Sequence, residues 1–232
     1  MGYSRASAQR SGRGVNVASP AWQHHVAMTT PDADRSKTPG DDACDVLSAA
    51  AIQDTLWTIG HSTRSWEAFL TLLRDARIDA LVDVRRYAGS RRNPQFSPDA
   101  MRSGLCDAGI DYLPMPEMGG RRTANSDSPN TAWRVAAFRA YADYLATPEF
   151  ARARERLMRL GNDKRTAVMC AEAVWWHCHR RLIADDFSAR GWQVLHLMTP
   201  ERSEPHPLHE AARMTEGVLR YPSEAAAQAT LF

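Results

Sequence analysis

Several features that would assign a protein class are missing from this chain. It has no uninterrupted apolar run close to the roughly 18 residues that a transmembrane helix needs. It has only four cysteines and no secretory hydrophobic segment, so we expect a cytoplasmic protein with free or metal-bound thiols and no membrane partner. The glycine-rich signatures of P-loop and dinucleotide-binding proteins are also absent. These absences argue against a membrane protein, a disulfide-framed secreted protein and both of these nucleotide-binding classes.

Acidic residues are missing from the first 31 positions, which contain three arginines among small polar residues. We interpret residues 1–52 as a disordered basic leader, or as a mis-assigned start with Met28 as the initiator, rather than as a transit peptide. Residues 53–200 are expected to form the folded domain and residues 201–232 a C-terminal extension. With 44% apolar residues, the chain can build one well-formed core, and its net charge of +2 argues against a dedicated duplex-DNA binder.

Short apolar segments alternate with amphipathic ones from residue 55 onward. The amphipathic segments carry helix-capping signals, such as Ser65 before Trp66 and Ser97 before Pro98. Strands are expected at 55–59, 80–84, 110–113, 166–169 and 193–197, and helices after Ser65, after Ser97, at 133–145, from Thr147 to 160 and from the segment after Cys170 to Gly191. This order predicts a single-domain, three-layer α/β fold, in which helices cover both faces of a mainly parallel sheet.

The densest reactive chemistry directly follows the apolar run 166–169. Residues 170–181, CAEAVWWHCHRR, contain two thiols, two imidazoles, a carboxylate and two guanidiniums. A buried strand that leads into such a segment predicts a site at its carboxyl end, where open α/β sheets bind their ligands. His61, Asp83 and Arg85 follow two other predicted strands, and we expect them at the same edge of the sheet.

Arginine pairs are frequent around this predicted edge, at 85–86, 91–92, 121–122 and 180–181. Guanidinium groups bind phosphate or carboxylate oxygens in pairs, and helix amino termini after Gly60 and Cys170 would add main-chain donors. We therefore predict an anion site for a phosphate-bearing small molecule, a nucleotide or a nucleic-acid end. The predicted anion-binding residues are Arg85, Arg91, Arg121, His179 and Arg180, and the predicted catalytic residues are Cys170, Glu172, His61 and Asp83.

Residue spacing narrows the other chemistries that cysteine could perform. A cysteine phosphatase needs a glycine-containing anion loop closed by arginine, but no glycine lies between Cys170 and Arg180. Zinc ligands are usually closely spaced, whereas seven residues separate Cys170 from Cys178. A metal would therefore need Cys170, Cys178, His177 and a remote partner such as His61, and the sequence indicates no particular cofactor.

Structural interpretations of the same residues stay open. Asp83 and Arg85 fit a structural ion pair at a strand end as well as they fit a site. Cys178 is also typical of a small buried core residue. Two functional alternatives to the anion site also stay open. One is a small-molecule enzyme with Cys170 as the thiolate nucleophile and Glu172 or a histidine for proton transfer. The other is a Cys/His metal or redox sensor.

Taken together, these motifs resemble one known family. They are TIGHS at 58–62, VDVR at 82–85, SRRNPQF at 90–96, GIDY at 109–112, MGGR at 118–121, and CAE at 170–172 with CHR at 178–180. In this order they resemble domain-of-unknown-function family 488 over about residues 55–200, and only the loop at Ala88-Gly89 departs, where relatives often carry proline. The resemblance implies a cytoplasmic, mainly bacterial α/β protein with a shared polar site and no established reaction.

The last five residues carry a second, separate signal. Gln228, Leu231 and Phe232 form a Gln-x-x-Leu-Phe ending that resembles the short peptide by which bacterial replication and repair proteins bind the DNA sliding clamp. The two apolar side chains would fill a pocket while the glutamine fixes the register by hydrogen bonds. We therefore predict the sliding clamp as a partner and an association with DNA repair. In the alternative interpretation, Leu231 and Phe232 pack on the domain.

Overall fold

The computed structural model describes residues 54–89, 92–123 and 125–223. The predicted leader, Arg91 and the clamp-like peptide lie outside the described residues. The elements are β1 (Thr55–Gly60), α2 (Trp66–Asp75), β2 (Ala80–Asp83), α3 (Pro98–Asp107), β3 (Asp111–Pro114), α4 (Ala136–Tyr144), α5 (Pro148–Asp163), β4 (Thr166–Cys170), α6 (Arg180–Ser188), β5 (Gln193–Thr199), β6 (Arg202–Pro205), β7 (Arg213–Thr215) and β8 (Val218–Arg220), with short 3-10 helices at Pro94–Phe96, Pro116–Met118 and Trp175–His177. In the described part of the chain, no helix combines the length and the apolar composition needed to cross a bilayer.

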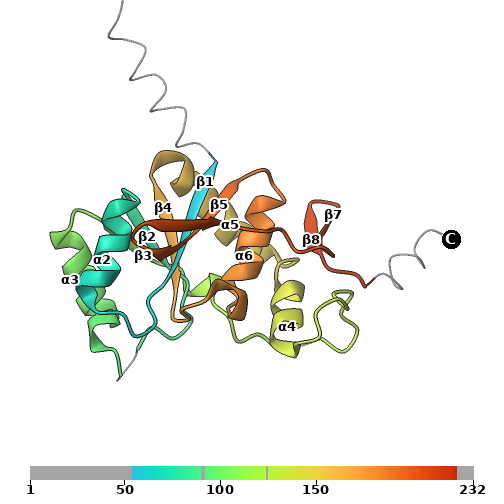
Figure 1. Ribbon diagram of the computed structural model, residues 1–232. Coiled ribbons are helices and arrows are strands. Elements are labelled where there is room, and N and C mark those ends of the chain that lie inside the picture. The colour runs from blue at the N-terminus through green and yellow to red at the C-terminus, as the bar shows by residue number, and fades with distance from the viewer. Residues whose placement is uncertain (1–53, 90–91, 124, 224–232) are drawn as a thin grey trace, which may run out of the picture. The chain divides into compact units, whose positions relative to one another are not determined.

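A six-stranded sheet in the order β3-β2-β4-β1-β5-β6 forms the centre of the fold. Strands β1 to β5 pair in parallel, and β6 runs antiparallel to β5. Strands β7 and β8 form a separate antiparallel pair. The predicted α/β class with a mainly parallel sheet is confirmed (Figure 1).

Helices cover both faces of this sheet. Successive strand residues point to opposite faces, so each strand contributes to two cores. In β4, Ala167 and Met169 pack with residues of α2 and α3, whereas Val168 and Cys170 pack with residues of α4, α5 and α6. Figure 1 shows α2 and α3 on one side of the strands and α4 and α6 on the other. This confirms the three-layer arrangement and places Cys170 on the α6 side.

The predicted helix starts follow from capping side chains. Ser65, Ser97 and Thr147 each accept a hydrogen bond from the backbone N–H three residues later. Such a cap contributes about 1 kcal/mol to stability. The helix predicted for 133–145 is shorter and starts at Ala136, because the preceding residues form a turn in which the N–H of Trp133 donates to Asn130.

The segment after Cys170 differs from the prediction. A helix was expected directly after this residue, but residues 171–179 form a loop with one 3-10 turn, and α6 begins at Arg180. The Arg180 guanidinium donates to the carbonyls of Glu172 (3.2 Å) and Ala173 (2.9 Å). These carbonyls are thereby bound to a side chain instead of to helical N–H groups. The expected helix amino terminus beside Cys170 is therefore absent.

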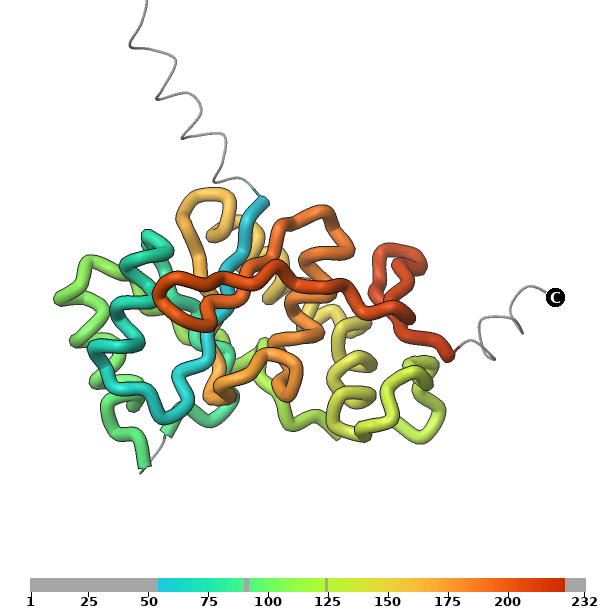
Figure 2. The backbone as a smooth tube through the Cα atoms, in the orientation of Figure 1, coloured from blue at the N-terminus to red at the C-terminus, as the bar shows by residue number. Residues whose placement is uncertain are grey.

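Residues 202–221, which the sequence assigns to the extension, pack on the sheet and on α6. Tyr221 is fully buried, and its hydroxyl donates to Asp185 of α6 (3.0 Å). The same carboxylate lies 2.8 Å from a ring nitrogen of His206, whose other ring nitrogen lies 2.9 Å from His196 of β5. Figure 2 shows this segment running from the sheet past α6 to the β7–β8 pair.

Candidate functional site

The carboxyl ends of β1, β2 and β4 meet at one edge of the sheet. Gly60 is in register with Cys170, and Asp83 with Met169. Beyond the strands, the N–H of His61 donates to the carbonyl of Cys170 (3.0 Å). Residues far apart in the sequence are thus held together by backbone hydrogen bonds.

Two glycines allow the surrounding loops to approach this edge closely. A Cβ atom on Gly60 would lie 1.8 Å from the carbonyl oxygen of Glu172, so the loop after β4 could not cross β1 there. A Cβ atom on Gly120 would lie 3.0 Å from Nδ1 of His179. Glycine at both positions brings the loops against the thiol-bearing segment.

A pocket of about 410 Å³ opens at this edge. Of the residues that the sequence predicts for the site, those lining the pocket are Arg85, Arg121, Cys170, Glu172, His177, Cys178 and His179. Three other predicted residues, His61, Asp83 and Arg180, are buried behind it. Arg86, from the predicted arginine pair 85–86, also lines the pocket, as do Tyr87, Phe138 and Tyr141, which the sequence did not indicate. Tyr141 has the helical spacing of an ordinary core residue, while Tyr87 directly follows the arginine pair 85–86 and could have been inferred from it.

The two thiols of the motif are in direct contact. Both cysteines are free and buried, and Sγ of Cys178 lies 2.8 Å from Sγ of Cys170. Burial alone would raise the pKa of the Cys170 thiol, but the hydrogen bond from Cys178 and the charge of Arg180 bring it below its ordinary value. Burial and the neighbouring sulfur raise the pKa of Cys178 well above its ordinary value. Cys178 is therefore the hydrogen-bond donor of the pair, and Cys170 is the acceptor and the more acidic of the two thiols.

A buried arginine adds a positive charge beside the thiol pair. Arg180 is 1% exposed, and two of its guanidinium nitrogens, Nε and Nη1, have no hydrogen-bond partner. None of the ion pairs in the described part of the chain involves Arg180. A guanidinium is always protonated, and burying it without a counter-charge is costly. Its positive charge acts to lower the pKa of both motif cysteines.

Arg85 is held in place by a polar cluster behind the pocket wall. Asp83 binds it with both carboxylate oxygens, at 2.8 Å to Nε and 2.6 Å to Nη2, and Tyr112 donates its hydroxyl to the same carboxylate (2.7 Å). The ring of His61 lies 3.2 Å from Nη1 of Arg85 and stacks on Phe96. Burial lowers the pKa of His61 to about 4, so this ring is neutral near pH 7.

The mouth of the pocket carries two exposed arginines, Arg86 and Arg121. Arg86 donates to the carbonyl of Arg121 (3.2 Å), and the Arg121 guanidinium lies over the ring of Tyr87. Neither forms an ion pair with a described residue. Arg121 also has a φ of 58°, in the left-handed region that is unfavourable for a side chain of this size. These two guanidiniums are thus available to a ligand.

His179 completes the wall beside the thiols. Its Nδ1 lies 3.5 Å from Sγ of Cys178. Burial lowers the pKa of His179 to about 4, so the ring is neutral near pH 7 and one of its nitrogens can accept a proton. Among the described residues, no group of three or more Cys, His, Asp or Glu side chains has the arrangement to hold a metal ion. The proposed ligand set of Cys170, Cys178 and His177 is therefore not assembled.

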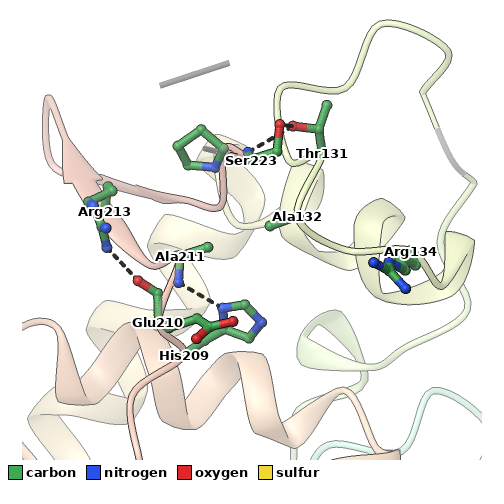
Figure 3. Close-up of a pocket in the computed structure, with 9 residues that line it drawn as sticks. Thr131, Ala132, Arg134, His209, Glu210, Ala211, Arg213 and Ser223 are labelled. Atoms are coloured by element: carbon green, nitrogen blue, oxygen red, sulfur yellow. Dashed lines mark hydrogen bonds between the residues drawn. The ribbon is translucent and has the colours of Figure 1, made fainter. Parts of the chain in front are cut away.

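A second cavity, of about 510 Å³, lies at the base of the β7–β8 pair. Figure 3 shows Thr131, Ala132 and Arg134 on one side of it, and His209, Glu210, Ala211 and Arg213 on the other. Arg213 donates to the carbonyl of Glu210, and Thr131 contacts Ser223. None of the residues that the sequence predicts for the site lines this cavity.

The comparison with family models gives one match. Residues 65–187 match the family described as Domain of unknown function DUF488, which is just over half of the 232-residue chain. The comparisons with curated proteins and with solved structures find no match. The matched range contains Asp83, Arg85, Cys170, Glu172 and Arg180 of the site. The chain belongs to the DUF488 family.

Proposed function

We propose that the pocket binds a phosphate-bearing ligand, a nucleotide or the end of a nucleic-acid strand, and presents the Cys170 thiolate to it as a nucleophile. One observation carries this proposal: Cys170, whose pKa is lowered by its hydrogen bond from Cys178 and by the charge of Arg180, lines the same pocket as Arg86 and Arg121, which form no ion pair with a described residue. A thiolate is the nucleophilic form of cysteine, and guanidinium groups match phosphate oxygens.

The negative charge at Cys170 and the positive charges at the mouth suggest how the ligand is oriented. A phosphate beside the thiolate would be repelled, whereas at the mouth it meets Arg86 and Arg121. We therefore place the phosphate at the mouth and the electrophilic atom of the ligand at Cys170. Arg85 lines the pocket between them, but its charge is already balanced by Asp83. Arg85 would therefore orient the ligand through hydrogen bonds more than attract it by net charge.

The remaining polar residues divide into two roles. The Glu172 side chain is exposed and lines the pocket, so it is our candidate for proton transfer to a leaving group. His61 and Asp83 are buried and contact Arg85, so we propose that they act by positioning this arginine.

Thiol alkylation with ligand protection tests the proposal. In the full chain with Cys44→Ser and Cys106→Ser, iodoacetamide should modify Cys170, and inorganic phosphate, AMP or a 5′-phosphorylated oligonucleotide should slow this reaction. Adding Arg86→Ala and Arg121→Ala should remove the protection while alkylation without ligand stays unchanged. The matched control is Arg74→Ala, an exposed arginine in α2, on the opposite face of the sheet. If none of the three phosphates protects Cys170, the anion site is disproved.

The C-terminal peptide carries a separate proposal, that it recruits the protein to the DNA sliding clamp. The last described residues are held on the domain, since the N–H of Ser223 donates to Thr131 (2.9 Å), and the Gln-x-x-Leu-Phe peptide begins five residues later. Clamp binding by the full chain should be lost when residues 228–232 are deleted and weakened by Gln228→Ala. Binding that survives the deletion would refute recruitment through this peptide.

A further inference from the structure

The two sulfur atoms of the site lie close enough to bond. They are 2.8 Å apart, and a disulfide bond is about 2.05 Å long, so bonding needs a shift of less than about 1 Å. Cys170 and Cys178 both line the pocket, which gives a small reagent a path to them. We propose that Cys170 and Cys178 form a redox-active dithiol that a peroxide oxidises to a disulfide and that a dithiol reduces again.

The surroundings of the two sulfurs assign them different roles. Cys170 ends β4, and its sulfur is the hydrogen-bond acceptor of the pair. Cys178 donates a hydrogen bond to Cys170, and the Cys178 sulfur also accepts a hydrogen bond from the backbone N–H of Arg180, at 3.5 Å. The thiolate is the form that attacks a peroxide. Cys170 is therefore the attacking sulfur and Cys178 the sulfur that resolves the product.

The oxidation balances in two steps. First, the Cys170 thiolate attacks one peroxide oxygen. The O–O bond breaks, the sulfur becomes a sulfenic acid, and the second peroxide oxygen leaves as hydroxide or alkoxide, which takes up a proton from solvent to give water or an alcohol. Second, Cys178 attacks the Cys170 sulfur, so that an S–S bond forms and the S–O bond breaks. The departing hydroxide takes up the Cys178 proton as water, with Nδ1 of His179, 3.5 Å from Cys178, able to carry it.

The reverse reaction needs an external dithiol. One of its thiolates attacks the disulfide and forms a mixed disulfide, releasing one protein thiolate. Its second thiol then displaces the other protein sulfur, so the reagent leaves as a disulfide and both cysteines are restored. No other cofactor takes part in either direction.

The loop between the cysteines keeps them together. Trp175, at the start of the 3-10 turn, stacks on the ring of His196 of β5, with centroids 4.4 Å apart and planes 7° from parallel. Glu172 and Ala173 are bound through their carbonyls to Arg180. Cys178 is thus fixed from both sides, and the approach of the sulfurs is built into the reduced fold.

The disulfide would also affect ligand binding, and this effect, unlike the redox chemistry itself, rests on the proposed function. A disulfide removes the thiolate that the pocket offers to a phosphate-bearing ligand. Oxidation by peroxides would therefore switch the pocket off, and a dithiol would restore it.

Peroxide treatment followed by intact-mass measurement tests the dithiol directly. The full chain with Cys44→Ser and Cys106→Ser is treated with a few equivalents of hydrogen peroxide. We expect the loss of two hydrogen masses, reversed by dithiothreitol. With Cys178→Ser added, the expected products are instead sulfenic and sulfinic acids on Cys170. With Cys170→Ser added, the peroxide reaction should slow by about tenfold or more, because the remaining thiol stays protonated.

The outcomes separate this inference from the proposed function. A chain that gains oxygen atoms without losing two hydrogens, although Cys178 is present, would overturn the dithiol. Equal peroxide rates in the Cys170→Ser and Cys178→Ser variants would overturn the assignment of roles. Protection of Cys170 by phosphate is measured on the reduced chain, so the two proposals can fail separately. Protection can be absent although the disulfide forms, and protection can be present although the disulfide does not form.

Discussion

Arg180 is the residue on which the chemistry of the site depends most. Its side chain leaves the first position of α6, turns into the protein and contacts two carbonyls of the motif loop. Because no carboxylate balances it in the described part of the chain, its charge acts on the thiol pair. Arg180 thus makes a buried cysteine ionisable.

Replacing Arg180 should therefore change the acidity of Cys170. In Arg180→Met, we expect the pKa of the Cys170 thiol to rise by about 1–3 units, since a nearby positive charge shifts a pKa by this amount. The pH dependence of alkylation measures this shift. The next residue gives a matched control, because Arg181 lies over the ring of Trp133 instead, and Arg181→Met should leave the profile in place. An unshifted profile in Arg180→Met would contradict the role given to this arginine.

The Asp83–Arg85 pair leads to a prediction about stability. Both side chains are buried, at 1% and 5% exposure, so Asp83→Asn leaves Arg85 buried without its counter-charge. We expect a loss of about 3–5 kcal/mol in the free energy of unfolding, measured with a denaturant. The exposed pair of Asp111 and Lys164 is the control, since Asp111→Asn should cost about 1 kcal/mol or less. Similar losses of unfolding free energy in the two variants would show that burial does not make the Asp83–Arg85 pair more important for stability than an exposed pair.

Sequence reasoning could reach some of these residues and not others. Cys170, Glu172 and Arg85 directly follow predicted strands, and parallel strands place such positions at one edge of the sheet. The direction of the Arg180 side chain depends on the path of the loop before it, which no local pattern encodes. The contact between Cys170 and Cys178 has the same origin, because their spacing of eight positions fits neither a helical turn nor a common metal motif.

Among the elements, the loop at 171–179 is held by contacts to β1 and β5. Gly60 in β1 leaves room for its backbone, and Trp175 stacks on His196 in β5. These contacts come from distant parts of the chain. They explain why the sequence of the motif, read alone, wrongly predicts a helix directly after Cys170.

Gly60→Ala tests how the loop is positioned. The added methyl group would meet the carbonyl of Glu172 at 1.8 Å, so the loop has to move. We expect a loss of about 1–3 kcal/mol in unfolding free energy. The disulfide between the motif cysteines should also form more slowly with peroxide. Gly89→Ala is the control, because a Cβ atom there meets nothing within 4 Å. If both alanine variants match the parent chain, the close approach at Gly60 does not position the loop.

For the whole molecule, buried neutral histidines predict that acid destabilises the fold. Burial lowers the pKa of His61 and His179 to about 4 and that of His196 to about 2. In the unfolded chain these rings titrate near about 6.5. As the pH falls below that value, the unfolded state binds protons that the folded state does not, so the folded state loses stability. The raised pKa of Asp186 acts in the opposite sense.

The size of this effect can be measured by urea unfolding at pH 7.5 and pH 5. A histidine as deeply buried as His179 should contribute a loss of about 2 kcal/mol between these conditions. The His179→Asn variant should show a correspondingly smaller difference. Stability that is constant from pH 7.5 to pH 5 would mean that the buried rings are not held neutral.

The architecture was predictable to different degrees along the chain. Strands β1, β2 and β4 are buried along their whole length, and such apolar runs are easily recognised. Strands β6 and β7 are short and largely exposed, so neither length nor alternation marks them. Only the fold shows that Tyr221 and His206 anchor this region to Asp185 of α6.

The proposed chemistry of the pocket depends on an acidic Cys170 thiol beside the buried Arg180. The most direct test is a pH titration of thiolate ultraviolet absorbance in the full chain with Cys44→Ser and Cys106→Ser, compared with the same chain carrying Cys170→Ser. We expect one thiolate to persist below the ordinary cysteine pKa of about 8.5 and to disappear with Cys170→Ser. A Cys170 thiol that ionises only at or above that value would contradict it.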